Sequence, residues 1–117
     1  LLRRSCKVLV HETGHMFGLE HCIYFRCVMN GSNHLQESDS RPMHLCPVCL
    51  RKAQYSFCNI RQDGTQTRFD VVERYRNLFR FYKSSGFDGE ARWVANRLKW
   101  ILGEEAAQRI IEQGSEQ

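Results

Sequence analysis

The chain has 117 residues, of which 42% are hydrophobic and 26% charged, and its formal net charge is +4. This length and composition allow a buried core, and no run approaches the roughly 20 consecutive apolar residues of a transmembrane helix. The small positive charge is spread along the chain, so we expect no nucleic-acid partner. We also expect no membrane partner and a monomer.

The first expected element is a helix over residues 3–17. Ser5 precedes an apolar stretch and is a candidate N-cap, because a serine hydroxyl accepts a hydrogen bond from the first turn of a helix. Gly18 is expected to end the helix in a sharp turn, since glycine tolerates positive φ. The apolar residues expected to hold this helix in place are Val8, Leu9, Phe17 and Leu19.

The same helix carries His11 and His15, which lie one turn apart on one face. Most such pairs are ordinary surface or core residues, but in the pattern H-E-x-x-H they can bind one zinc ion. The turn at Gly18 lets His21 supply a third nitrogen. A glycine turn and a third histidine at this spacing together form a specific pattern, which favours a zinc site over ordinary surface or core histidines. Glu12 lies where its carboxylate can reach a zinc-bound water. Three ligands with an open fourth position are typical of a catalytic zinc site.

The next segment, residues 21–43, is expected to be irregular. The pair Asn30-Gly31 predicts a turn, because it readily takes positive φ. Residues 33–43 are polar, lack periodicity and contain Pro42, so we expect a loop there. His34 and His44 lie in or beside this loop, and histidines in such loops are more often ordinary polar residues than metal ligands.

Four of the six cysteines form two close pairs, Cys22 with Cys27 and Cys46 with Cys49. The second pair is a C-x-x-C knuckle, and the spacing of both pairs suits a structural zinc site of four thiolates. Disulfides are the alternative that the spacing leaves open. Free thiols would indicate the cytoplasm or the nucleus. The other two cysteines, Cys6 and Cys58, are expected to be small buried apolar residues or free thiols.

The remaining chain has helical periodicity. One helix is predicted over residues 48–57, after Pro47, and Asp63-Gly64 predicts a turn before the next element. A helix over 69–83 follows, because apolar residues recur there at intervals of three and four. Its apolar stripe is Val72, Tyr75, Phe79 and Tyr82.

A last long helix is predicted over residues 89–102, and Gly103 should break it before a short amphipathic tail to Ile111. Its apolar side is expected to contain Trp93, Val94, Leu98, Ile101 and Leu102. No segment predicts a sheet, so the expected fold is mainly α with irregular zinc-braced loops. We expect a zinc-binding subdomain with the histidine helix and the four cysteines over 1–58, and a helical extension over 59–117.

Taken together, these motifs resemble archaemetzincins, the archaelysin family of metallopeptidases in the metzincin clan. The run from His11 to His21 resembles the zinc motif of the clan, and Met29 falls at its Met-turn. The cysteine pattern resembles the archaemetzincin branch. The segment 45–52 is similar to the animal members, in particular to the second animal paralogue. The resemblance covers roughly residues 6–55.

The resemblance implies a catalytic zinc on the three histidines, with Glu12 as the general base, and an apolar floor formed by Met29. Gly31 stands where some metzincins have a tyrosine that stabilises the tetrahedral intermediate. The fold implied is the carboxy-terminal part of an α+β metalloprotease domain without its amino-terminal sheet. The resemblance also implies a structural zinc on Cys22, Cys27, Cys46 and Cys49.

The expected function is therefore hydrolysis of peptide bonds in a peptide or protein substrate, by a zinc-bound water that Glu12 activates, with two Zn²⁺ ions in the chain. The alternative is a non-catalytic, zinc-braced interaction module, because the substrate-binding sheet would precede Leu1. A nucleic-acid-binding zinc module is disfavoured, since no basic helix with base-reading side chains follows the knuckle. Substrate preference is expected to depend partly on residues 33–44.

Overall fold

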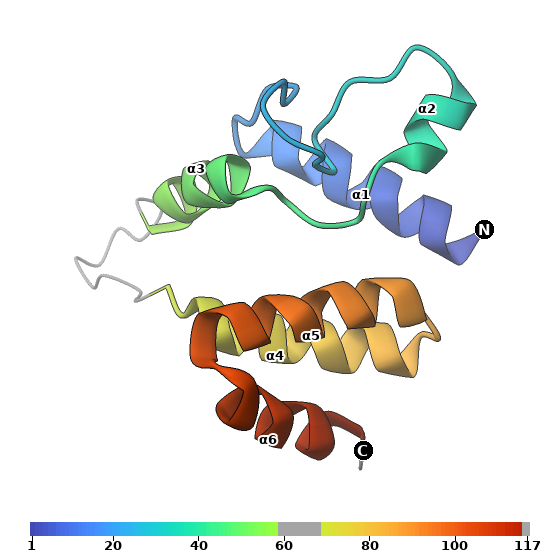
Figure 1. The fold of residues 1–117 in the computed structure, drawn as a ribbon. Coiled ribbons are helices and arrows are strands. Elements are labelled where there is room, and N and C mark those ends of the chain that lie inside the picture. The colour runs from blue at the N-terminus through green and yellow to red at the C-terminus, as the bar shows by residue number, and fades with distance from the viewer. Residues whose placement is uncertain (59–68, 116–117) are drawn as a thin grey trace. The chain divides into compact units, whose positions relative to one another are not determined.

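The computed structural model describes residues 1–58 and 69–115, and these form helices α1 to α6 (Figure 1). The chain divides into two compact units, Leu1–Phe69 and Asp70–Gln117. Within the described residues no strand forms, and one isolated bridge joins Cys22 to Asn30. The prediction of a mainly α fold is confirmed. The expected boundary after residue 58 adjoins the residues that are not described, which also contain Asp63-Gly64, and it stays a prediction.

Helix α1 spans Leu2–Met16, close to the predicted 3–17. The predicted cap is wrong: Ser5 lies inside α1, and its backbone N–H already donates to the carbonyl of Leu1 at 2.9 Å. Gly18 adopts φ +87°, as predicted for the turn that follows the helix. Val8 and Leu9 do not supply the expected packing, because they are 43% and 68% exposed.

The core of the first unit lies mainly outside the helices. It is built by the loop that follows α1 and by the start of α3, which spans Pro47–Cys58 and matches the predicted helix. Four of its members are cysteines, so sulfur atoms fill much of the space that aliphatic side chains occupy in an ordinary core. The buried residues are Leu19, Cys22, Cys27, Val28, Met29, Cys46, Cys49 and Ala53.

A short helix, α2 (Leu35–Ser40), stands where a loop was predicted, so that prediction is wrong. Its first turn is closed by reciprocal hydrogen bonds. The backbone N–H of Glu37 donates to His34 Nδ1 at 3.3 Å, and the Glu37 carboxylate accepts from the backbone N–H of Asn33 at 2.7 Å. This arrangement resembles a capping box, but histidine replaces serine or threonine and the carboxylate bonds to the residue before the cap, which explains why sequence rules did not indicate it.

The turn after Met29 also differs from its prediction. Positive φ occurs in the described residues only at Gly18, Gly86 and Gly103, so neither Asn30 nor Gly31 adopts the left-handed conformation expected of an Asn-Gly turn. The side chain of Asn30 holds the segment instead. Its amide donates to the carbonyls of Cys22 and Phe25, and its oxygen accepts from the backbone N–H of Cys27.

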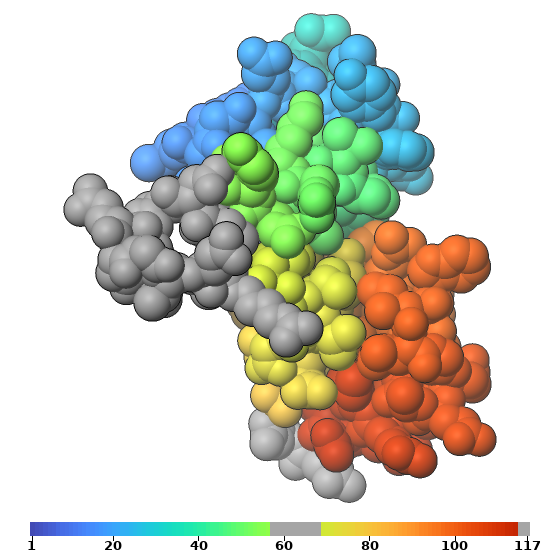
Figure 2. Space-filling view, turned by 90° about the vertical axis from the view of Figure 1, so that its left-hand side faces the viewer, coloured from blue at the N-terminus to red at the C-terminus, as the bar shows by residue number. Residues whose placement is uncertain are grey.

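The second unit consists of α4 (Val71–Ser84), α5 (Asp88–Leu102) and α6 (Glu104–Ser115), close to the predicted helices. Asp70 caps α4 by accepting from the N–H groups of Val72 and Glu73. Positive φ at Gly86 and Gly103 permits the turns between the helices. Side chains of α5 and α6 form a continuous surface in the space-filling view (Figure 2).

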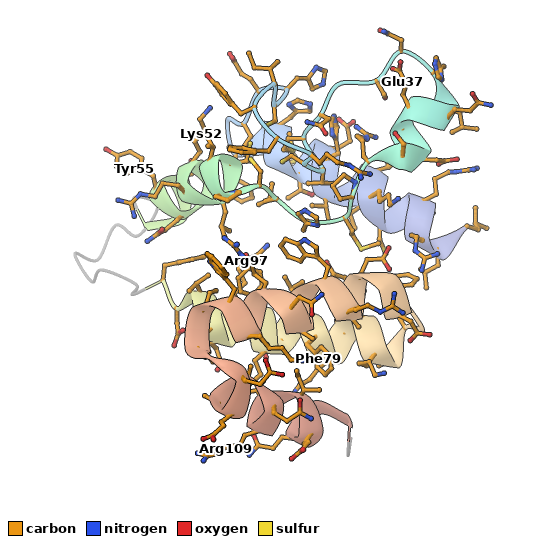
Figure 3. The ribbon with its side chains drawn as sticks, viewed as in Figure 1. Glu37, Lys52, Tyr55, Phe79, Arg97 and Arg109 are labelled. Carbon is orange, nitrogen blue, oxygen red and sulfur yellow. The ribbon has the colours of Figure 1, made fainter. Side chains whose placement is uncertain are left out.

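The predicted apolar stripes supply much of the core of this unit, but not all of their members are buried. Tyr75, Phe79, Tyr82, Val94 and Leu98 are buried, Val72, Trp93 and Leu102 are half-buried, and Ile101 is 39% exposed. Val94 and Leu98 are completely buried. Phe79 extends from α4 toward α6 (Figure 3), where Gly114 leaves room for its ring: a Cβ on Gly114 would lie 2.9 Å from Phe79 Cδ1. No helix in the described part of the chain is long and apolar enough to cross a membrane.

Candidate metal sites

The first candidate site is the cluster of His11, His15 and His21. Helix α1 places the first two rings one above the other, with centroids 4.7 Å apart, and the turn at Gly18 returns the chain. The ring of His21 then lies 5.3 Å from that of His11 and 4.9 Å from that of His15. One ring nitrogen from each residue lies within 4.8 Å of the others. The structure therefore brings together all three histidines that the sequence singled out.

Backbone carbonyls fix the orientation of two of these rings. His11 Nδ1 lies 2.7 Å from the carbonyl oxygen of Val28, and His15 Nδ1 lies 2.7 Å from that of Leu19. A carbonyl can only accept, so each Nδ1 carries a proton, and in the neutral ring each Nε2 is left with a bare lone pair. These two Nε2 atoms face each other at 3.1 Å.

Two lone pairs at this distance repel each other, and a cation bound by all three histidines would remove this repulsion. Carbonyl groups that hold Nδ1–H, and so direct Nε2 to a metal, are the usual supports of zinc-bound histidine. The donor set of the cluster therefore fits a zinc ion. Burial is the main cause that lowers the pKa of His11, and it favours the neutral ring that a metal requires.

His21 is exposed, and its position depends on Gly31. A Cβ on Gly31 would lie 3.1 Å from His21 Nδ1, which is tighter than ordinary van der Waals contact. Glycine at this position is therefore explained by close packing against the third histidine rather than by positive φ. Glu12 is exposed and directly follows His11 in α1, and its negative charge acts to raise the pKa of His11 against the larger, lowering effect of burial.

The second candidate site is formed by the four paired cysteines, whose sulfur atoms lie within 4.8 Å of one another. All four are buried and free. Cys22 Sγ and Cys46 Sγ are 3.6 Å apart, much farther than the roughly 2.05 Å of a disulfide bond. The structure therefore has free thiols at this site, and not the disulfides of the alternative. The four residues are Cys22, Cys27, Cys46 and Cys49.

Backbone N–H groups point at the sulfur atoms of this cluster. Cys27 Sγ accepts from the N–H groups of Met29 and Cys46 at 3.4 and 3.2 Å, and Cys46 Sγ accepts from that of Cys49 at 3.4 Å. Such bonds stabilise thiolates, the form that binds zinc. Burial acts against ionisation, yet backbone groups of Phe25 and Tyr24 lower the pKa of Cys22 to about 7. Burial raises the pKa of Cys27 and that of Cys49.

The two clusters share a connection through Met29, which is completely buried. Its backbone carbonyl accepts from the N–H of Cys22 at 2.9 Å, and its thioether lies against Gly14, between the two histidines of α1. A Cβ on Gly14 would lie 2.5 Å from Met29 Sδ. The sequence reasoning missed Gly14, although a glycine inside a helix costs about 1 kcal/mol and so needs a packing reason.

A second residue that the sequence reasoning missed is Arg41, a buried arginine at the C-cap of α2 whose guanidinium contacts the ring of His11. No motif or spacing indicates it. His34 and His44 take part in neither cluster. Cys6 is free and half-buried, and the side chain of Cys58 lies outside the described residues.

A surface hollow of about 720 Å³ lies beside His21. One wall is the segment 22–26, which presents the exposed apolar side chains of Ile23, Tyr24 and Phe25, and the other is the segment 30–33. Of the residues 33–44 that were expected to influence substrate preference, Asn33 lines this hollow.

Comparison with known proteins gives a consistent set of relatives. A family model described as peptidase family M54 matches residues 1–55. The chain is 53% identical over 91 residues to archaemetzincin-2 of Macaca fascicularis, an alignment that covers 76% of this chain and 22% of the relative. It is 49% identical over 88 residues to archaemetzincin-2 of Homo sapiens, which covers 75% and 22% respectively.

Similarity to archaemetzincin-1 of Homo sapiens is lower, at 40% over 76 residues, covering 65% of this chain and 13% of the relative. The chain thus spans about a fifth of the length of the archaemetzincin-2 relatives. No solved structure matches the chain.

Proposed function

We propose that the chain carries the zinc centre of a metallopeptidase, on the premise that the model of peptidase family M54 matches residues 1–55. The observation that carries this proposal is the pair of bare Nε2 atoms of His11 and His15, 3.1 Å apart, with His21 completing the set. An exposed carboxylate, Glu12, stands beside them.

We propose that His11, His15 and His21 hold the catalytic zinc, the three-ligand arrangement that leaves a position open. Zinc bound there supplies Lewis acidity, which polarises a peptide carbonyl and lowers the pKa of water. The Glu12 carboxylate accepts a proton from the attacking water and returns it to the departing amine. Met29 closes the floor of the site with an apolar thioether and keeps α1 in register with the loop below it.

We propose a second zinc, held by the four cysteines, with a structural role. The two cysteine pairs lie on either side of Met29, so a metal at the thiolates fixes the loop that presents Val28 O to His11. This gives two zinc ions per chain. It also explains how a loop with little regular structure keeps the histidines in place, since zinc binding contributes folding energy directly.

We propose that the substrate is a peptide or protein. We also propose that the chain forms the carboxy-terminal part of an α+β metzincin fold. Gly31 makes room for His21 and has no hydroxyl, so the donor that stabilises the tetrahedral intermediate must lie elsewhere. We further propose a monomer that acts in the cytoplasm or the nucleus without a nucleic-acid partner.

The test uses the full natural chain, loaded with zinc and supplied with a broad peptide library. Glu12→Gln should reduce cleavage by at least about 10²-fold, the scale of a lost general base, while zinc content stays the same. His11→Ala should lose activity together with one metal equivalent. If the zinc-loaded chain cleaves no peptide, the non-catalytic interaction module replaces the peptidase as the function.

A further inference from the structure

Arg41 is an unusual feature of the first unit, because its side chain is charged yet the residue is only 7% exposed. Its guanidinium donates to the carbonyl of Asn30 at 3.0 Å, and to the hydroxyl and carbonyl of Ser38 at 2.7 and 3.3 Å. All of these acceptors are neutral. Among the described residues no carboxylate forms an ion pair with Arg41. Burial of a charge in such surroundings is costly, so it calls for an explanation.

The fourth contact of the guanidinium is with His11. Nη1 lies 2.8 Å from Nδ1 of this ring and 3.5 Å from Nε2. A donor aligned with the in-plane lone pair of one ring nitrogen would be much farther from the other nitrogen of the same ring. An in-plane position near both atoms would collide with the ring carbons. Nη1 must therefore lie over the face of the imidazole.

This position agrees with the rest of the ring's environment. The in-plane direction of Nδ1 is already taken by the carbonyl of Val28, and Nε2 points toward His15. A planar guanidinium over the face of a ring stacks on it and leaves the in-plane atoms free. The edge and the face of the His11 ring are thus held by two different parts of the chain.

We propose that Arg41 is a positioning residue that clamps the His11 ring in the orientation required for metal binding. The planar guanidinium spans three anchors: the segment after Met29 through Asn30, helix α2 through Ser38, and the first ligand on α1. It therefore couples the loop that follows the Met29 segment to the first histidine. The consequence for metal affinity rests on the proposed function; the orientation of the ring does not.

A purely electrostatic role of Arg41 would change the metal affinity in the opposite direction. A fixed positive charge beside a metal ligand repels a bound cation, so removal of that charge alone would tighten metal binding. Removal of a clamp weakens metal binding, because the His11 ring then gains orientations that do not bind the metal. Loss of an outer-shell partner typically lowers metal affinity by 10- to 100-fold. The direction of the change therefore separates the two explanations.

The experiment is a Co²⁺ titration of the full chain and of Arg41→Met, Arg41→Lys and Arg4→Met. Cobalt at the four thiolates gives intense sulfur-to-metal charge-transfer absorption, which reports that the unit is folded, whereas cobalt at the histidines gives weak visible bands. Arg4→Met is the matched control, since it removes one positive charge and the contact of α1 with Asp39 in α2, but leaves His11 untouched.

We expect Arg41→Met and Arg41→Lys to weaken binding at the histidines by about tenfold or more, with the thiolate band retained. Arg4→Met should change the affinity at the histidines by less than about twofold, because an exposed ion pair contributes little. Unchanged or tighter binding in Arg41→Met would overturn the proposal. Full affinity in Arg41→Lys would also overturn it, because charge rather than the planar fork would then suffice.

A second measurement does not require metal at the histidines. ¹⁵N spectra of the rings at pH 8, with one zinc equivalent for the thiolates, should show His11 protonated at Nδ1 alone, and both tautomers in Arg41→Met. Both tautomers in the unmodified chain would overturn the clamp. If the unmodified chain shows the single tautomer but binds no cobalt at the histidines, the proposed function fails while the clamp stands.

Discussion

The two units of this chain are stabilised in different ways. In the second unit, three helices bury a regular apolar stripe in which Val94 and Leu98 are completely buried. In the first, half of the core residues are cysteines, and Leu9 of α1 is 68% exposed. The comparison indicates that apolar burial is enough to specify α4–α6, whereas the loops of the first unit surround the four cysteines to which we assign the proposed structural zinc.

The largest expected effect follows from this difference. Removal of zinc by a strong chelator, or the substitution Cys46→Ser, should unfold the first unit and leave the helices of the second. Structural zinc contributes on the order of 10 kcal/mol in small zinc domains, more than the typical stability of a domain. Amide hydrogen exchange measures both units at once. Equal protection in α1 and α5 after metal removal would show that the thiolates are not structural.

The reverse experiment targets the second unit. Leu98→Ala should destabilise α4–α6 by about 2–5 kcal/mol, because it leaves a cavity at a completely buried position. Zinc content should not change, since none of the proposed ligands lies in this unit. Urea denaturation with metal analysis checks both points. Loss of zinc in this variant would mean that the units are not independent.

A smaller effect distinguishes two glycines that lie within helices. Gly14→Ala should destabilise the first unit by about 1–3 kcal/mol, because the new methyl group would overlap Met29 Sδ. Gly89→Ala is the matched control in α5, where a Cβ meets no atom within 4 Å, and it should stabilise by about 0.4–1 kcal/mol. Urea denaturation of both variants gives the signs. The overlap explanation fails if Gly14→Ala is also stabilising.

The smallest effect concerns the exposed pair of Arg4 and Asp39, 2.7 Å apart. The Arg4 hydrogen bond lowers the pKa of the Asp39 carboxyl from its ordinary value of 3.8. The pair therefore stabilises the folded chain above pH 3.8, and this contribution is lost as the pH falls through the lowered pKa. Carboxyl NMR titration should show the low midpoint, and Arg4→Met should return it toward 3.8. An unchanged midpoint would contradict the assignment.

The sequence predicted the second unit well, because apolar periodicity alone decides which faces of its helices pack. The sequence also indicated the two clusters of candidate metal ligands, since the H-E-x-x-H pattern and the paired cysteines are short-range signals. The first unit differed where long-range contacts decide the structure. Helix α2 depends on a histidine cap, Gly31 on the proximity of His21, and Arg41 on a ring 30 positions earlier in the chain.

Zinc-edge anomalous diffraction from crystals of the full natural chain tests the central claim most directly. Two separate peaks per chain are expected, one among His11, His15 and His21 and one among the four cysteines. The first peak should disappear in His15→Ala while the second remains. A single peak at the cysteines in fully zinc-loaded crystals, with the three rings turned apart, would contradict a catalytic metal centre in this chain.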